Sequence, residues 1–229
     1  MLQFLHVDAL RIEALADEIG EGFEAAAAGW EPELLAARVA DYTPAWLDEL
    51  CLAGEVAWAR LTPRRVDSSA SASRVTPIAL VSRANLAGLL AAVRDNQEAA
   101  PGADAAAEIL EALRARGALF FDEIVAATRR LATDVEQGLR ELVARGLAAS
   151  DGFQGLRQLS GLRRRSGHGR PRGTGYLRAG GGPPGRWSLI AAPPRDPAEG
   201  IEALAELVAG TLLARYGVVS RDLVAQIGR

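Results

Sequence analysis

The chain has 229 residues, of which 49% are hydrophobic and 24% are charged, and its formal net charge is −3. This length and composition are typical of a globular protein with one large domain or two small ones. The single cysteine, Cys51, excludes an intramolecular disulfide. The sequence has neither a basic-then-apolar leader nor an apolar run of about twenty residues, so we expect a cytoplasmic protein with no membrane partner.

The small net charge hides a strong asymmetry along the chain. Residues 1–151 contain 14 Arg and 24 acidic residues, residues 152–195 contain 9 Arg and no acidic residue, and residues 196–229 contain 3 Arg and 5 acidic residues. A nucleic-acid-binding face is a local property, which an average over the chain conceals. Residues 152–195, with a local charge of +9, are therefore the expected place for phosphate contacts.

The first hundred residues predict a small module of helices and strands that is incomplete at its N-terminus. Thr43 is a plausible helix cap, Pro44 suits the first helical position, and Gly54 is a plausible end of the same helix. Alternation over 55–61 is typical of a half-buried strand. We expect a helical and β-barrel-like module at 1–100, with helices at 7–19, from 30, at 43–54 and at 85–95, and strands at 55–61 and 76–82.

Residues 101–192 have the expected order of a winged helix-turn-helix: helix, short strand, helix, helix, strand, turn, strand. Thr133 and Glu136 fit a capping box at the start of the third helix. Four apolar residues at helical spacing form its predicted inner face: Val135, Leu139, Leu142 and Val143. The opposite face is then expected to be free, and it carries Gln137, Arg140, Glu141 and Arg145. Because this helix enters the major groove in helix-turn-helix proteins, Arg140 and Arg145 are candidate nucleic-acid contacts.

Between the two wing strands lies a segment that is rich in glycine and arginine. Residues 152–186 contain 11 Gly and 3 Pro, a composition that does not form its own packed core, and we interpret it as a long wing between strands at 147–153 and 185–190. The alternative is a solvated low-complexity insertion. In this segment the candidate nucleic-acid-binding residues are Arg163, Arg164, Arg165, Arg170, Arg172, Tyr176 and Arg178, with Tyr176 as a base-stacking candidate. For Trp187 we favour a place in the core.

After a linker at 193–194, the sequence begins to repeat. Residues 213–217 resemble 113–117, and residues 221–225 resemble 122–126 with a slip of one residue. Residues 196–229 are therefore predicted as the truncated start of a second winged helix, and we expect the chain to be a segment of a longer protein. The expected fold class is α+β: a small helix and β-barrel-like module, a winged helix-turn-helix, and the start of another.

Several separated stretches resemble the large helicase-related (Lhr) family of bacterial ATP-dependent DEAD/DEAH-box helicases, in the region C-terminal to the motor domains. They are AWLDELCLAGEVAWARLTP at 45–63, TPIALVSR at 76–83, RARGALFFDEIVAAT at 114–128, and GLRELVARGLAASDGF at 138–153. The resemblance implies a DNA-binding accessory segment of a 3′-to-5′ helicase acting in DNA repair. It also implies two partners: single-stranded DNA or a DNA/RNA hybrid, and helicase motor domains in cis or on a neighbouring chain.

The sequence contains neither a G-x-x-x-x-G-K-[ST] loop nor a D-E-x-H box, so ATP and Mg²⁺ are expected in the motor and no cofactor in this chain. His6 and His168 support neither a zinc site nor a general base, and we assign no catalytic or metal-binding residue. Cys51 is expected to be a small buried hydrophobe. Two alternatives remain: a winged-helix DNA glycosylase-type module for base excision, and a free-standing winged-helix transcription regulator. For the glycosylase, the available carboxylates are those of Asp41, Asp48 and Glu49.

Overall fold

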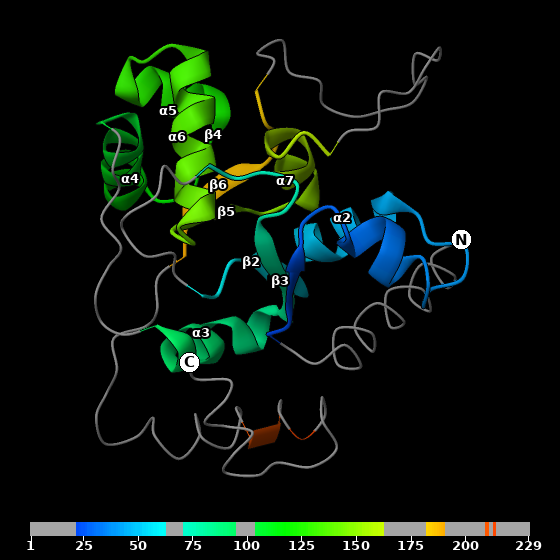
Figure 1. The fold of residues 1–229 in the computed structure, drawn as a ribbon. Coiled ribbons are helices and arrows are strands. Elements are labelled where there is room, and N and C mark those ends of the chain that lie inside the picture. The colour runs from blue at the N-terminus through cyan, green and yellow to red at the C-terminus, as the bar shows by residue number, and fades with distance from the viewer. Residues whose placement is uncertain are drawn as a thin grey trace, which may run out of the picture.

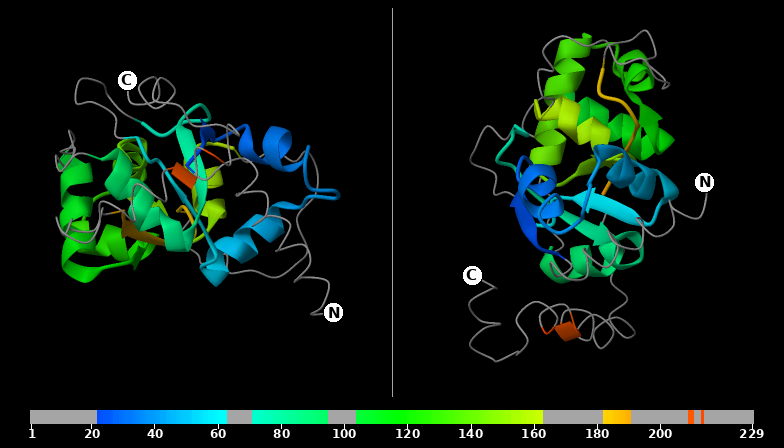
Figure 2. Two further views of the ribbon diagram at one scale, coloured as in Figure 1. Left: turned by 90° about the horizontal axis from the view of Figure 1, so that it is seen from below. Right: turned by 90° about the vertical axis from the view of Figure 1, so that its right-hand side faces the viewer.

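Two adjoining parts, each with a three-stranded antiparallel sheet, make up the structure (Figure 1). The computed structural model describes residues 22–62, 71–94, 104–162 and 182–190, together with 209, 210 and 213. The N-terminal part is formed by residues 22–94 and the C-terminal part by residues 104–190. Seen from two further directions, the two parts remain in contact along one side of each (Figure 2).

The N-terminal part consists of strands and helices in the order β1, η1, α2, β2, β3, α3. Its sheet has the order β1-β3-β2, and both pairings are antiparallel. The strands that we expected in a barrel-like module therefore form a three-stranded sheet in the described residues. The elements are β1 (Glu24–Ala26), the π-helix η1 (Trp30–Leu35), α2 (Pro44–Ala53), β2 (Val56–Ala59), β3 (Pro77–Ser82) and α3 (Arg83–Val93).

Helix α2 begins and ends where the sequence predicts. Thr43 occupies the N-cap position with an extended backbone, although its side chain makes no capping hydrogen bond, and Pro44 takes the first helical position. Gly54 ends the helix with φ +80°, in the left-handed region that glycine enters without steric cost. The residues at its two ends are thus sufficient to predict the bounds of this helix from the sequence.

Strand β2 differs from its prediction in burial. The alternating pattern over 55–61 predicted one solvated face, but all four residues of β2 are buried. One reason is that the C-terminal part packs against this strand: the Trp58 ring lies edge-on to the Trp187 ring, with centroids 6.3 Å apart. The expectation of a half-buried strand is therefore wrong.

The C-terminal part has the element order that we expected for 101–192, with one additional helix. Its sheet has the order β4-β6-β5, so the last strand lies between the first two, as in the N-terminal sheet. The elements are α4 (Asp104–Arg116), β4 (Leu119–Phe120), α5 (Phe121–Thr128), α6 (Ala132–Ala144), β5 (Ala148–Ser150), α7 (Phe153–Leu159) and β6 (Arg186–Leu189).

The additional helix, α7, replaces the beginning of the predicted wing. Phe153, Leu156 and Leu159 are spaced at three residues, so they lie on one side of a helix, and all three are almost fully buried. The high glycine and arginine content of 152–186 hid this short apolar repeat. The expectation that the whole segment lacks packed structure is therefore wrong for residues 153–159.

The first residues of the helices in the C-terminal part also differ from the sequence predictions. Helix α6 begins at Ala132 with Leu131 as its N-cap, and the capping box predicted for Thr133 and Glu136 is absent. A backbone-to-carboxylate bond is found one helix earlier instead, where the amide of Phe120 donates to the Glu123 carboxylate at 2.7 Å. This bond fixes the junction between β4 and α5.

Several predictions lie outside the described residues. They are the helix at 7–19, the arginine-rich residues 163–178, and nearly all of the second winged helix predicted at 196–229. Within the described ranges of the chain, no helix is both long and apolar enough to cross a membrane.

Candidate nucleic-acid interface

Helix α6, the predicted recognition helix, has the predicted inner face. Val135, Leu139, Leu142 and Val143 are at most 1% exposed, and they pack on α4 and the rest of the core. Gly138 lies on the same side, where a Cβ would come 3.2 Å from the backbone of α4. This close approach holds α6 tightly against α4.

The outer face of α6 is not free along its whole length. Its N-terminal half is open, with Thr133 and Gln137 exposed. Its C-terminal half is covered by the N-terminal part, because the amide of Ala72 donates to the Arg140 carbonyl at 2.9 Å and Arg60 donates to the Ala144 carbonyl at 2.8 Å. A nucleic acid therefore has access to only half of this helix.

The side chain of Arg145 is buried, contrary to its predicted place on a free face. Its Nε donates to Glu141 Oε1 at 2.9 Å, and the two side chains are 5% and 11% exposed. The sequence pattern placed both residues opposite the apolar stripe but did not reveal what covers them. In this structure Arg145 has almost no surface with which to contact a phosphate.

Arg140 is half-buried and already has two protein partners. Its guanidinium donates to the Leu159 carbonyl at 2.7 Å and forms an ion pair with Glu136 one turn away. These bonds connect α6 with the C-terminal end of α7, just before the arginine-rich segment. Its contact with nucleic acid stays a prediction.

The structure describes the two ends of the arginine-rich segment but not the candidates within it: Arg163, Arg164, Arg165, Arg170, Arg172, Tyr176 and Arg178. At one end, Leu162 packs against the core after α7. At the other end, a Cβ on Gly182 would overlap the Phe121 ring, and the Pro184 carbonyl lies within 3 Å of the Cβ position of Gly155. Both ends are therefore fixed to the C-terminal part, beside α7 and the start of α5.

An ion-pair cluster that no sequence pattern predicted connects the N-terminal and C-terminal parts. Arg157 of α7 pairs with Glu31 of η1 at 2.7 Å and with Asp48 of α2 at 2.6 Å, and it also donates to the Pro44 carbonyl at 3.0 Å. The Phe153 ring lies under the guanidinium, 5.1 Å from its centroid. The two carboxylate partners are 109 and 126 positions away, so no local pattern could reveal the cluster.

The same cluster bears on the glycosylase alternative. Both oxygens of Asp48 are engaged, one by Arg157 and the other by the amide of Gln154 at 2.9 Å. Asp41 and Glu49 are exposed on the surface. The arrangement gives these carboxylates structural and solvated roles, and within the described residues no group of three or more potential metal ligands occurs.

Tyr42 completes the cluster from the N-terminal side. Its hydroxyl donates to Glu31 Oε1 at 2.8 Å. Burial and the neighbouring Glu31 charge raise the pKa of the Tyr42 phenol well above its ordinary value. The hydroxyl therefore remains a hydrogen-bond donor at neutral and alkaline pH.

A second arginine, Arg94, also connects the N-terminal and C-terminal parts, and its hydrogen bonds to backbone carbonyls are here called the Arg94 clasp. Arg94 donates to the carbonyls of Arg60 at 2.8 Å, Gly146 at 2.6 Å and Ile190 at 3.1 Å. Burial lowers the pKa of its guanidinium from the ordinary value. Gly146 has φ +74°, and a Cβ there would come 2.7 Å from both the Arg60 carbonyl and the Arg94 guanidinium, so a side chain would push the clasp apart.

We expect Cys51 to be unreactive in the folded protein. Burial, with a smaller contribution from the Asp48 charge, raises the pKa of this thiol to about 12, so little thiolate forms at pH 8.5. Alkylation by iodoacetamide should be at least about 100-fold slower in buffer than in urea. Because the folded thiol holds its proton above the pH at which the unfolded thiol loses it, the free energy of unfolding should fall as pH rises from about 9 to about 12. Equal alkylation rates with and without urea would contradict this.

The described residues thus form a mixed helix and sheet protein with two three-stranded antiparallel sheets, each with its last strand in the centre. Residues 11–83 match the family model described as "Large helicase-related protein, winged-helix domain". Residues 11–83 are therefore similar to a winged-helix domain of the Lhr helicase family, and the resemblance seen in the sequence is confirmed over those residues. The matched residues lie within the module that we expected to be barrel-like, N-terminal to the winged helix that we expected at 101–192. No curated protein matches the chain.

Proposed function

We propose that the chain is a DNA-binding accessory segment of an Lhr-type ATP-dependent 3′-to-5′ helicase that acts in DNA repair, and that it works without its own ATPase motor. The observation that carries this proposal is the match of residues 11–83 to the Lhr winged-helix domain. Its partners would be single-stranded DNA or a DNA/RNA hybrid, and motor domains in cis or on a neighbouring chain. ATP and Mg²⁺ would act in those motor domains.

We further propose that the chain contains two winged helices in tandem. Strand β3 lies between β1 and β2, and β6 lies between β4 and β5, so each sheet has its last strand in the centre. A pair of helices separates the first strand from the second in both sheets, η1 and α2 in one and α5 and α6 in the other. The predicted helix at 7–19 would supply the first helix of the N-terminal repeat.

Within this tandem, nucleic acid would reach two places. One is the arginine-rich segment, because nine Arg and no acidic residue occur in 152–195. The other is the open half of α6 with the turn before it, where Arg129, Thr133 and Gln137 are exposed. The junction between the N-terminal and C-terminal parts would serve as the rigid support for both.

The test is a salt titration of single-stranded DNA binding by fluorescence anisotropy. We expect replacement of Arg163, Arg164 and Arg165 by alanine to weaken binding to all sequences alike, because the contacts are to phosphates. The slope of log affinity against log salt should flatten by up to about 2, at roughly 0.7 for each lost contact.

A matched control removes the same charge elsewhere. Arg38, Arg74 and Arg83 are exposed arginines of the N-terminal part, and their triple alanine variant should leave the slope within about 0.5 of that of the unmodified protein. Equal slopes for both triple variants would contradict phosphate contact by the arginine-rich segment. Failure of the unmodified protein to bind single-stranded DNA would contradict the proposed function itself.

A further inference from the structure

Arg157 and Arg186 each lie over a phenylalanine ring, and they differ in the hydrogen bonds that their guanidinium groups make. Arg157 lies 5.1 Å from the Phe153 centroid, and its donors are taken by Glu31, Asp48 and the Pro44 carbonyl. Arg186 lies 5.0 Å from the Phe120 centroid, and its guanidinium has no hydrogen bond or ion pair within the described ranges of the chain. The first pair is therefore structural, whereas the second holds its donors toward solvent.

The backbone around Arg186 is fixed on both sides. Arg186 faces Phe120 directly in the antiparallel pairing of β6 with β4. On its other side, its amide donates to Asp151 Oδ1 at 2.9 Å, and its carbonyl accepts from the Asp151 amide at 3.0 Å. Its side chain is nevertheless exposed.

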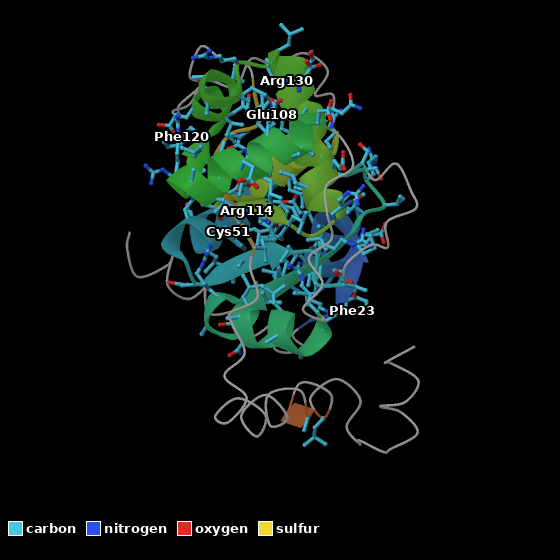
Figure 3. All side chains as sticks on the ribbon, turned by 90° about the vertical axis from the view of Figure 1, so that its left-hand side faces the viewer. Phe23, Cys51, Glu108, Arg114, Phe120 and Arg130 are labelled. Atoms are coloured by element: carbon cyan, nitrogen blue, oxygen red, sulfur yellow. The ribbon has the colours of Figure 1, made fainter. Side chains whose placement is uncertain are left out.

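The position of Phe120 is fixed in the same way. The hydrogen bond that its backbone amide donates to the Glu123 carboxylate anchors the end of β4. Figure 3 shows Phe120 at the margin of the molecule, on the same side of the junction as Glu108 and Arg130 and away from Phe23. Arg186 and Phe120, here called the stacking pair, therefore form a small, preorganised surface feature.

We propose that the stacking pair is a contact site for single-stranded DNA, in which the Arg186 guanidinium donates to a phosphate and supports a base on its plane. This inference rests on the proposed function. A guanidinium is planar and always charged, it donates in a fixed fork, and it stacks on aromatic rings with little loss of hydration. Unstacked bases are commonly held on such planes as well as on aromatic side chains.

The position of the pair in the chain agrees with this assignment. Arg186 follows Arg178, the last candidate of the arginine-rich segment, by eight residues and opens the strand that returns to the sheet. The next acidic residue after Arg186 in the sequence is Asp196, ten residues further on, while in space the Asp151 carboxylate accepts from the Arg186 amide. Near Phe120, Asp122 and Glu123 are both exposed, and one oxygen of the Glu123 carboxylate accepts a hydrogen bond from the Phe120 amide.

The test compares Arg186→Ala, Arg186→Lys and Phe120→Leu with the control Arg74→Ala, which removes an exposed arginine that has no ring contact within the part of the chain that the structure describes. The probes are a fluorescein-labelled oligo(dT) and the same oligonucleotide with abasic sites. We expect Arg186→Ala to bind oligo(dT) about tenfold more weakly, which corresponds to about 1.4 kcal/mol. It should also reduce the salt slope by about 0.7, while Arg74→Ala should leave affinity within about twofold.

The lysine and leucine variants separate stacking from charge. Arg186→Lys and Phe120→Leu keep the positive charge, so we expect an unchanged salt slope. Both should bind oligo(dT) about three- to fivefold more weakly than the unmodified protein, yet bind the abasic strand equally well, because lysine has no plane and leucine has no ring. Thermal unfolding of each variant checks that it is folded.

The possible outcomes distinguish a failure of the proposed function from a failure of the stacking pair as a contact site. No binding of oligo(dT) by the unmodified protein would contradict the proposed function. Binding by the unmodified protein with equal effects of Arg186→Ala and Arg74→Ala would overturn the stacking pair as a contact site and leave the proposed function intact. If Arg186→Ala does not fold, Arg186→Lys decides: equal affinity for oligo(dT) and unchanged preference over the abasic strand would overturn the proposal.

Discussion

Replacing Arg157 with methionine is expected to lower the free energy of unfolding by about 3 kcal/mol, measured by urea denaturation. Methionine fills most of the same space but leaves Glu31 and Asp48 without their cation. Those two side chains are only 17% and 22% exposed, so water replaces the lost partner incompletely. For a chain of this size the midpoint of thermal unfolding should fall by about 6–12 °C.

Two further variants show whether the orphaned carboxylates cause this loss. Arg114→Met breaks an exposed pair with Glu111 and should cost no more than about 0.5 kcal/mol. The triple variant Arg157→Met, Glu31→Gln, Asp48→Asn should recover some of the loss, because neutral amides are less costly to leave half-buried. Similar losses for Arg157→Met and Arg114→Met would show that the cluster does not hold the N-terminal and C-terminal parts together.

The sequence predicted the elements whose ends have strong local signals. Pro44 and Gly54 bound α2 as predicted, and Gly117, with φ +77°, directly follows the end of α4. The inner face of α6 was predicted correctly because its four apolar residues follow the helical period. In these cases a single property of the local sequence is sufficient.

Other elements have weak or misleading local signals. Strand β1 consists of Glu24, Ala25 and Ala26, which have no β-branched or aromatic side chain, and it is defined only by pairing with β3. Helix α7 lies in a segment whose composition favours disorder, so its three buried side chains were overlooked. Pairing and packing with distant segments decide both elements.

The candidate site was harder to predict than the fold, because burial of a polar face depends on a distant segment. Nothing near Arg145 in the sequence indicates that Ala72 and Arg60 approach the end of α6. The clasp of Arg94 has the same character, since its acceptors are backbone carbonyls from three separate segments. An amphipathic pattern identifies which face is polar, but not whether that face meets solvent or protein.

The tryptophan pair at the junction is expected to be the largest single contribution to stability. Trp58 and Trp187 are 1% and 0% exposed, and they bring the two sheets together edge to face. Trp187→Ala should lower the free energy of unfolding by about 4 kcal/mol, because it opens a large cavity at the junction. Since the core continues across the junction, we also expect one cooperative transition, seen alike by circular dichroism and by tryptophan fluorescence.

Phenylalanine variants provide a matched comparison within the same pair. Trp58 Nε1 donates to the Gly152 carbonyl at 3.1 Å, whereas Trp187 Nε1 is buried with no partner among the described residues. Both changes remove a similar volume, but only Trp58→Phe removes a hydrogen bond and leaves a buried carbonyl with one donor fewer. Trp58→Phe should therefore be less stable than Trp187→Phe by about 1 kcal/mol. The reverse order would show that Trp187 Nε1 has a partner, and two separate unfolding transitions in either variant would show that the sheets do not fold as one unit.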